Sequence, residues 1–366
     1  MKEVLLVVVI VTALGFDFTN GFHDTANAVA TSISTRAMPP RVAVAFSASL
    51  NFVGAFISLK VATTIASGIV ATQATTTSVV FAALIGAIAW NLVTWRLGLP
   101  SSSSHALIGG LVGAAWAAVG AGAIQAGGIL DKVIIPAIIS PVLAFVVAWT
   151  SIVLAYRVVG RRRPGVVARG FKAGQVLSSG LLSLSHGTND GQKTMGVITL
   201  ALVAEGAIPS THIYVPTWVI VASASAMAFG TYAGGWRIIK TTGTRIVKMD
   251  PSQGFAAQSA GAAAILAVSH YGFPISTTHV INGGVMGAGA AKRLSAVRWG
   301  VAANIVVAWM LTLPAAAAAA AAAWGLTRVL GGGLTGPLML FAIASLLLFT
   351  GFARRARAHA VPVTQS

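Results

Sequence analysis

Cysteine is absent from this 366-residue chain, and charged residues are scarce. Without cysteine the protein can form no disulfide framework, thiolate nucleophile or thiolate metal site. Charged residues make up 8% of the sequence, whereas a soluble domain carries about 25%. Apolar residues make up 56%, which excludes a disordered chain. The composition therefore indicates a polytopic membrane protein.

Acidic residues are the scarcest charged group, because seven Asp and Glu stand against 24 Lys and Arg, a formal net charge of +17. A nucleic-acid-binding domain of this charge would still need a polar exterior, so no nucleic-acid partner is predicted. The 40 glycines are instead typical of transmembrane helices that pack closely through small residues. At about 20 residues per crossing, the chain has room for roughly fourteen spans at most.

The apolar blocks predict an all-α membrane protein of about 10–12 transmembrane helices. Several blocks contain Gly, Pro or polar clusters, which indicates broken or re-entrant helices. No small-residue cleavage site follows the apolar run that begins at Val4, so this run is predicted to be a retained membrane element and not a signal peptide. The blocks cover residues 4–32, 42–59, 79–97, 101–119, 133–156, 174–204, 215–234, 254–271, 275–291, 299–324 and 335–352.

The basic residues fall mainly on one predicted side of the membrane. If each block crosses once and segment 157–172 is cytoplasmic, 19 of the 24 Lys and Arg lie in cytoplasmic loops or in the C-terminal tail. An excess of Lys and Arg marks the cytoplasmic side of multi-pass proteins. The pattern predicts a plasma-membrane protein with its N-terminus outside and its C-terminus in the cytoplasm.

Two motifs recur in the same order along the chain, which indicates an internal repeat. Residues 98–113 (GLPSSSSHALIGGLVG) match residues 272–287 (GFPISTTHVINGGVMG) at seven of sixteen positions. Residues 21–27 (GFHDTAN) match residues 187–193 (GTNDGQK) more weakly. Because each half holds five blocks, an odd number, the second half must be inserted upside down. Inverted repeats with broken helices are typical of secondary transporters, which bind substrate at the repeat interface.

The repeat also predicts how the chain is divided. The two halves are similar in length, and a basic segment separates them. The predicted parts are a first inverted repeat over residues 1–156, a basic cytoplasmic linker at 157–172, a second inverted repeat over 173–326, and an extra transmembrane helix with a cytoplasmic tail over 327–366.

Each copy of the longer motif places hydroxyl side chains after a proline, which is typical of a helix start. A helix that begins inside the membrane directs unpaired N–H groups and the positive end of its dipole at whatever lies before it. Two such starts would form a cage of neutral donors suited to a tetrahedral oxyanion. Hydroxyls that bond back to their own helices are the structural alternative, which the repetition in register disfavours. The predicted substrate ligands are Ser102, Ser103, Ser104, Ser276, Thr277 and Thr278.

Asp24 and Asp190 occupy the centre of the shorter motif, whereas the other five acids lie at block ends or in polar segments. A carboxylate inside a membrane is costly and points to function, although an Asp can also cap a broken helix. Two carboxylates beside an anion need neutralising cations, because unpaired charge in this medium costs many kcal/mol. The acids therefore predict cation-coupled symport. A channel with a donor-lined selectivity filter is the main rival.

Residues 187–194 nearly match the phosphate-binding loop G-x-x-x-x-G-K-T, but Gln192 replaces its second glycine and no nucleotide-binding domain surrounds it. ATP hydrolysis is therefore rejected. Lys193 is interpreted as an intramembrane cation that pairs with a motif acid or with substrate, with snorkelling as the alternative. An intramembrane hydrolase is rejected too, because adjacent Ser104 and His105 point different ways on a helix and no G-x-S-x-G elbow exists. The chain is not expected to be an enzyme.

Four segments together resemble the PiT family of inorganic phosphate transporters. The similarity extends over essentially the whole chain, with the four segments in the family's order. It implies inorganic phosphate held by the Ser/Thr helix starts, coupling cations at the two Asp motifs, alternation between inverted halves in the lipid bilayer, and a homodimer. The segments are residues 20–29 (NGFHDTANAV), 100–105 (PSSSSH), 185–190 (SHGTND) and 274–279 (PISTTH).

The resemblance also bears on the coupling cation. Na⁺-coupled members resemble G-x-N-D-x-x-N in both halves, whereas here His23 replaces one Asn and Lys193 another. Both changes resemble the bacterial branch that carries phosphate with protons, often as a neutral metal–phosphate complex. We therefore favour H⁺ over Na⁺, and assign no resident metal and no cofactor beyond the co-transported cation. Histidines can relay protons. The predicted cation-coupling residues are Asp24, Asn27, Asn189, Asp190 and Lys193, and the predicted proton-relay residues are His23, His105 and His279.

Overall fold

The computed structural model describes residues 2–68, 70 and 75–360, and helices make up most of them. Within these ranges, β-structure is limited to two isolated bridges, Val70–Ile124 and Val247–Val297. The predicted all-α class is confirmed. The α-helices are α1 (Lys2–Ser34), α2 (Pro40–Gly54), α3 (Lys60–Gly68), α4 (Thr77–Leu97), α5 (Ser103–Val119), α6 (Ala126–Ile129), α7 (Ile135–Val159), α8 (Pro164–His186), α9 (Gln192–Ala204), α10 (Thr217–Ala233), α11 (Trp236–Lys240), α12 (Pro251–His270), α13 (Thr277–Lys292), α14 (Trp299–Val329) and α15 (Thr335–Ala360).

Membrane character is visible in the length and the surface of the helices. Four spans among the described residues are long and apolar enough to cross a membrane: Glu3–Ser34, Thr77–Leu97, Ala126–Val159 and Trp299–Val329. Large apolar side chains point outward from α7 and α14, and a surface of this kind suits lipid better than water. α5 has 17 residues and α13 has 16, so each is about 25 Å long. They are shorter than the ~30 Å hydrocarbon core and match the predicted re-entrant helices.

The two copies of the Asp motif differ in local structure. α1 runs without a break through the first copy, although the polar residues near Asp17 could have interrupted it. The second copy lies in a π-helical turn, Gly187–Gly191, which joins α8 to α9. Single π-helical turns inside α-helices occur frequently at functional sites. Asp190 lies within this turn.

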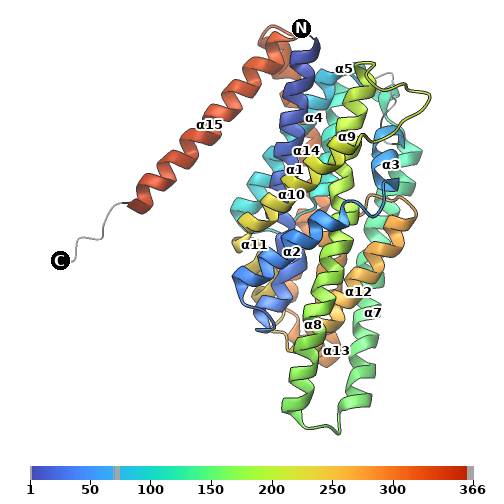
Figure 1. Ribbon diagram of the computed structural model, residues 1–366, viewed down its shortest axis with the longest axis vertical. Helices are drawn as coiled ribbons and strands as arrows, with labels where there is room; N and C mark the ends of the chain where they lie inside the picture. Colours follow the sequence, from blue (N-terminus) through green and yellow to red (C-terminus); the bar gives the residue numbers. More distant parts are fainter. Residues whose placement is uncertain (1, 69, 71–74, 361–366) are drawn as a thin grey trace, which may run out of the picture.

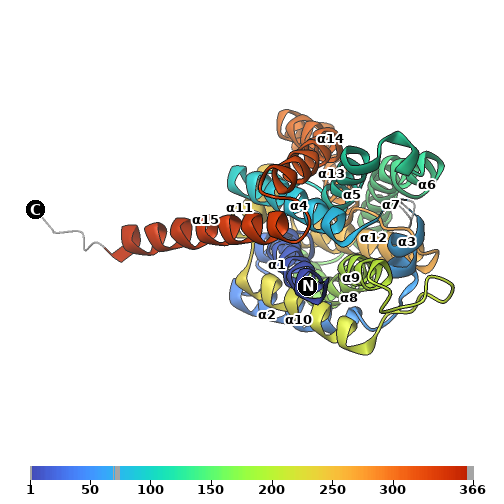
Figure 2. The same ribbon diagram turned by 90° about the horizontal axis from the view of Figure 1, so that it is seen from above.

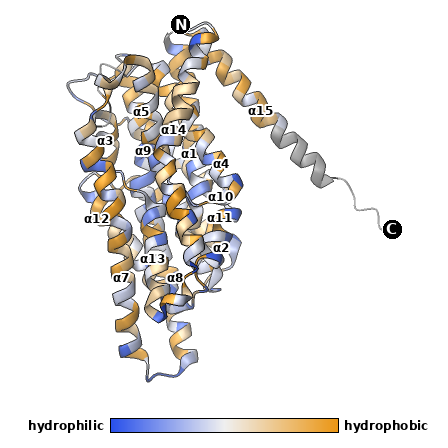
Figure 3. Cartoon of the chain, turned by 180° about the vertical axis from the view of Figure 1, so that it is seen from behind, coloured by the Kyte–Doolittle hydropathy of each residue, from blue (hydrophilic) through white to orange (hydrophobic). Residues whose placement is uncertain are grey.

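The two halves of the chain run in opposite directions through the bundle. α1 starts at the upper end of Figure 1 and descends, whereas α8 starts at the lower end and continues upward as α9. The hydrophilic loop between α7 and α8 forms the lowest point of the molecule (Figure 3). These directions agree with an inverted arrangement, while the repeat boundaries at residues 156 and 173 stay predictions.

Glycines join the two halves in a reciprocal pattern. Four glycines from the longer motif lie directly against backbone carbonyl groups of a helix in the other half, at positions where a Cβ atom would meet backbone. The hydroxyl-rich helix of each half therefore packs on the long helix of the opposite half, and the two helix starts are held face to face. The contacts are Gly109 to Leu313, Gly113 to Ala317, Gly283 to Pro141 and Gly287 to Phe145.

The last helix, α15, leaves the bundle. Figures 1 and 2 show it projecting sideways from the upper end, away from the packed helices. Its described outward residues include Leu346, Leu347 and Phe349, all large and exposed. Residues 361–366 of the predicted cytoplasmic tail lie outside the described residues.

Candidate substrate and cation site

α5 and α13 begin deep inside the protein, each after the proline of its motif. Ser102 caps α5 by accepting the backbone N–H of His105 at 3.1 Å. Ser276 caps α13 in the same way, with the N–H of His279 at 3.3 Å. The first N–H groups of a helix have no acceptor within it, so both starts present free donors to the junction. Two of the six predicted substrate ligands thus hold their own helices in place, and four face the junction.

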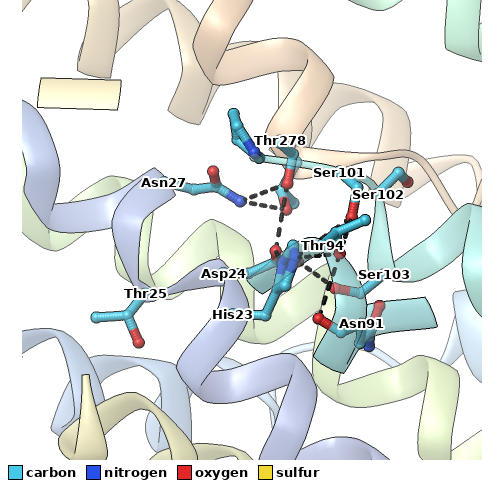
Figure 4. Close-up of polar contacts among 12 residues, drawn as sticks. His23, Asp24, Thr25, Asn27, Asn91, Thr94, Ser101, Ser102, Ser103 and Thr278 are labelled. Atoms are coloured by element: carbon cyan, nitrogen blue, oxygen red, sulfur yellow. Dashed lines mark hydrogen bonds and ion pairs between the residues drawn. The ribbon is translucent and has the colours of Figure 1, made fainter. Parts of the chain in front are cut away.

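Asp24 on α1 joins both helix starts (Figure 4). Its carboxylate accepts the hydroxyl of Ser103 at 3.1 Å and the hydroxyl of Thr278 at 3.3 Å. His23 contacts the same carboxylate, with its Nδ1 2.7 Å from Oδ1 of Asp24. Because Ser103 belongs to α5 and Thr278 to α13, the carboxylate contacts both halves of the protein. All four side chains are buried.

The second ring nitrogen of His23 extends the Asp24 network toward α4. Nε2 lies 3.2 Å from Oγ1 of Thr94 and 3.3 Å from Oγ of Ser101. Ser101 also donates to Thr94 at 2.8 Å. His23 therefore bridges a carboxylate and a hydroxyl pair, an arrangement that lets an imidazole pass a proton between them. Neither Thr94 nor Ser101 was among the residues predicted for the site.

Asp190 is bound to a buried lysine. Nζ of Lys193 lies 2.7 Å from Oδ1 of Asp190, and the lysine side chain is 1% exposed. The same ammonium donates to the carbonyl of Ile275 at 2.9 Å and to the hydroxyl of Ser104. Thr277 donates to the other carboxylate oxygen at 3.3 Å. Each hydrogen of the ammonium thus has an oxygen acceptor, so Lys193 fills a cation position and does not snorkel.

Asn27 and Lys193 stand at equivalent positions in the two Asp motifs and make equivalent contacts. Asn27 donates to Thr278 at 2.9 Å, and Lys193 donates to Ser104, the counterpart of Thr278 in the longer motif. A neutral amide in one half is therefore a fixed cation in the other. The side-chain oxygens of Asn27 and Asn189 are both buried without a hydrogen-bond partner, which leaves them free to bind a cation.

The predicted relay histidines separate into two groups. Of the three, His23 alone contacts a motif acid. His105 and His279 pack edge to face with ring centres 4.7 Å apart, and His279 stacks on a tryptophan of α14. His186 was not among the three predicted relay residues, yet its Nε2 lies 3.4 Å from the carboxylate of Asp190. The signal for it was the spacing of four residues, which places two side chains on one helix face.

A metal ion also has candidate ligands at the junction. Ligand atoms of Asp24, His186 and Asp190 all lie within 4.8 Å of one another. One nitrogen and two carboxylates suit a divalent transition metal, and carboxylates suit harder cations. Lys193 already neutralises one of these carboxylates. The group therefore suits a transient cation better than a resident metal, and we assign none.

Asp17 is a third buried acid that the sequence interpretation set aside as part of a polar segment. It lies within the continuous helix α1 and is 0% exposed. The signal for it was the spacing of seven residues from Asp24, because residues seven apart lie on the same face of a helix. It lies outside the network described above.

Two inverted halves that bury a charge-compensated, donor-lined site at their junction define a secondary transporter. A family model described as "Phosphate transporter family" matches residues 20–169 and 161–320 of the chain. The protein belongs to the phosphate transporter family. Because this family consists of transporters, the expectation that the chain is not an enzyme is confirmed.

Similar proteins are found across bacteria. A "Probable low-affinity inorganic phosphate transporter" of Mycobacterium tuberculosis is 52% identical over 98% of this chain and 85% of its own length. A protein of the same description from Bacillus subtilis is 44% identical over 88% of this chain and 96% of its own length. Among solved structures, "The sodium-dependent phosphate transporter" matches with a TM-score of 0.81 and 25% identity, covering 89% of this chain and 99% of that one.

Proposed function

We propose that the protein is a secondary active symporter that imports inorganic phosphate across the plasma membrane with H⁺ as the coupling cation. The preference for H⁺ over Na⁺ rests on the ion pair between Lys193 and Asp190, whose charged atoms lie 2.7 Å apart. A tethered ammonium sits where a second free cation would otherwise bind. The remaining acid, Asp24, contacts a histidine, the side chain best suited to exchange a proton near neutral pH.

A count of formal charges supports one proton for each phosphate. With Asp24 and Asp190 ionised and Lys193 protonated, the junction carries a net charge of −1. Binding of dianionic phosphate would bring the net charge to −3, and the desolvation cost of that charge in a buried site is prohibitive. A neutral metal–phosphate complex adds nothing, and one proton on the His23–Asp24 pair then brings the total to zero. The charge balance therefore favours metal–phosphate as cargo.

The hydroxyl groups provide the link between cation and substrate. Ser103, Thr277 and Thr278 donate to the motif carboxylates in this structure. A cation or proton on the carboxylate weakens those bonds, because hydrogen bonds to a charged acceptor are about twice as strong as neutral ones. The freed hydroxyls, together with the helix N–H groups, then bind the phosphate oxygens. Binding of the cation would thus precede and enable binding of the anion.

Na⁺ coupling is the second candidate, and two observations favour it. The free side-chain oxygens of Asn27 and Asn189 are suitable ligands for Na⁺. The solved structure that this fold resembles is that of a sodium-dependent phosphate transporter. Against Na⁺ stands the ammonium of Lys193, which repels a second cation placed beside Asp190.

The test is uptake of labelled phosphate by purified protein in proteoliposomes under imposed gradients. A pH gradient, acidic outside, should drive accumulation, with added Mg²⁺ increasing it if the cargo is metal–phosphate. Accumulation that follows a Na⁺ gradient and ignores pH would establish the second candidate instead. Equilibration without accumulation under every gradient would identify a channel. Lys193→Asn should lose proton-driven accumulation, while the matched control Lys240→Asn, at an exposed position, should keep it.

The remaining properties are expectations about orientation and assembly. We expect the N-terminus outside and the C-terminus in the cytoplasm, because 19 of the 24 Lys and Arg fall on one side of the predicted topology. We also expect a homodimer. Accessibility of single cysteines, introduced into this cysteine-free chain, would test the orientation, and light scattering in detergent would test the dimer.

A further inference from the structure

A stripe of buried polar side chains runs along one face of α1. Its members are spaced alternately three and four residues apart, which keeps them on one face. All are between 0% and 2% exposed. The stripe consists of Asp17, Asn20, Asp24, Asn27 and Thr31.

The part of the stripe nearest the N-terminus has no role in the site already described. Asp17 lies two turns before Asp24, about 10 Å along the helix axis. The polar side chains beside the Asp17 carboxyl are those of Asn20 and Thr194, both neutral, and neither makes a hydrogen bond of good geometry to it. The Thr194 hydroxyl, on α9, and the Asn20 amide make no hydrogen bond to any other group among the residues that the structure describes. The two carboxylate oxygens, the amide oxygen of Asn20 and the hydroxyl of Thr194 thus form a cluster of four oxygens.

The charged groups that act on Asp17 belong to one neighbouring segment, α9 and the π-helical turn before it. Lys193 and Asp190, from α9 and its π-helical turn, influence the carboxyl through space. The other main neighbours of α1 contribute none in the interior: α4 carries only Arg96 and α10 only Tyr232, and both are exposed. Asp17 therefore lacks a bonded counter-charge.

A carboxylate in this position cannot stay ionised and empty. Burial of an unpaired charge costs several kcal/mol, so the group must hold a proton or another cation. Internal symmetry does not require an acid here, because the repeat places Ser183 at the equivalent position of the second half. An intramembrane acid whose adjacent polar side chains are all neutral points to an ion pathway.

We propose that Asp17, with Asn20 and Thr194, is a separate binding site for the coupling cation, through which the cation passes between the N-terminal end of α1 and Asp24. The inference rests on the proposed symport function. The oxygen ligands suit a proton shared by Asp17 and an amide oxygen, and they also suit Na⁺. The shared chemistry is a monovalent cation, and the coupling experiment decides which one.

The first test separates binding of phosphate from coupling. Asp17→Asn keeps the shape and removes the charge. In proteoliposomes this variant should retain exchange of internal for external phosphate, which needs no net cation movement, and should lose at least tenfold in gradient-driven accumulation. Asp17→Glu should restore part of the accumulation, and Ser183→Ala should leave both activities unchanged. Accumulation by Asp17→Asn at the wild-type level would overturn the proposal.

A second measurement distinguishes a cation site from a structural role. Because Asp17→Asn removes an unpaired buried charge, its thermal unfolding temperature in detergent should equal or exceed that of wild type. Infrared difference spectra should show a protonated carboxyl band that Asp17→Asn lacks; for Na⁺, the variant should instead lose one equivalent of bound ²²Na⁺. A lower unfolding temperature with parallel loss of exchange and accumulation would show a structural role. If the wild-type protein failed to accumulate phosphate under any imposed gradient, the proposed function itself would be refuted, independently of Asp17.

Discussion

Removal of the buried ammonium of Lys193 should destabilise the protein far more than removal of a surface lysine. Lys193→Met keeps the length of the side chain but leaves Asp190 as an uncompensated buried charge. It also removes one of the two donors to the carbonyl of Ile275, the other being the hydroxyl of Ser104. Breaking a buried ion pair costs about 3–5 kcal/mol. We expect a loss of this size in the free energy of unfolding, measured by denaturant titration in detergent with tryptophan fluorescence.

A double-mutant cycle isolates the ion pair from the change in packing. Asp190→Asn removes the orphaned charge, so the double variant should be less destabilised than the sum of the two single variants by about 2 kcal/mol or more, within the range seen for residues in contact. The internal control is the exposed pair of Lys292 and Asp250, 3.6 Å apart, whose lysine is 57% exposed. Lys292→Met should cost about 0–1 kcal/mol and respond to salt. Additive effects of Lys193→Met and Asp190→Asn would refute the assignment of Lys193 as a tethered cation.

Three further predictions address packing, substrate binding and coupling. Gly113→Ala should destabilise the protein by about 1–3 kcal/mol, because its Cβ meets the backbone of α14, whereas Gly300→Ala, with open space around it, should be nearly neutral; equal thermal shifts would contradict the packing argument. Ser102→Ala should cost about 1 kcal/mol of stability through the lost cap with KM for phosphate little changed, whereas Ser103→Ala should raise KM; a reversed pattern would exchange their roles. Asp24→Asn should abolish accumulation of labelled phosphate, and retained accumulation would remove this acid from coupling.

The membrane class, the repeat and its glycine-rich helices could be predicted from the sequence, because composition and periodicity are local properties. The longer motif also contained the packing pattern: Gly109 and Gly283 hold the same place in both copies and contact equivalent carbonyls. The approach of Asp24 to α5 and α13 follows from the same repeat. These features depend on residue identity and spacing alone.

Side-chain direction could not be predicted in the same way. The rotation of each helix about its axis is set by packing against its neighbours, so adjacent hydroxyls divide between a cap at Ser102 and a carboxylate contact at Ser103. The same cause turns His105 toward His279 and away from the acids. Asp17 was set aside as part of a polar segment, whereas the structure places it inside the continuous helix α1, where a buried acid is unusual.

The reciprocal contacts of the four motif glycines limit how the transporter can move. Because each hydroxyl helix is packed against the opposite half, the two repeats could rock against each other as separate bodies only by breaking these glycine contacts. The extensively packed pairs are mixed, α5 with α14 and α13 with α7, and each contains one segment from either half. A half-length chain alone would leave its glycine face unpacked, and only a partner inserted in the opposite orientation could cover it. Covalent linkage of two such halves makes that opposite orientation permanent.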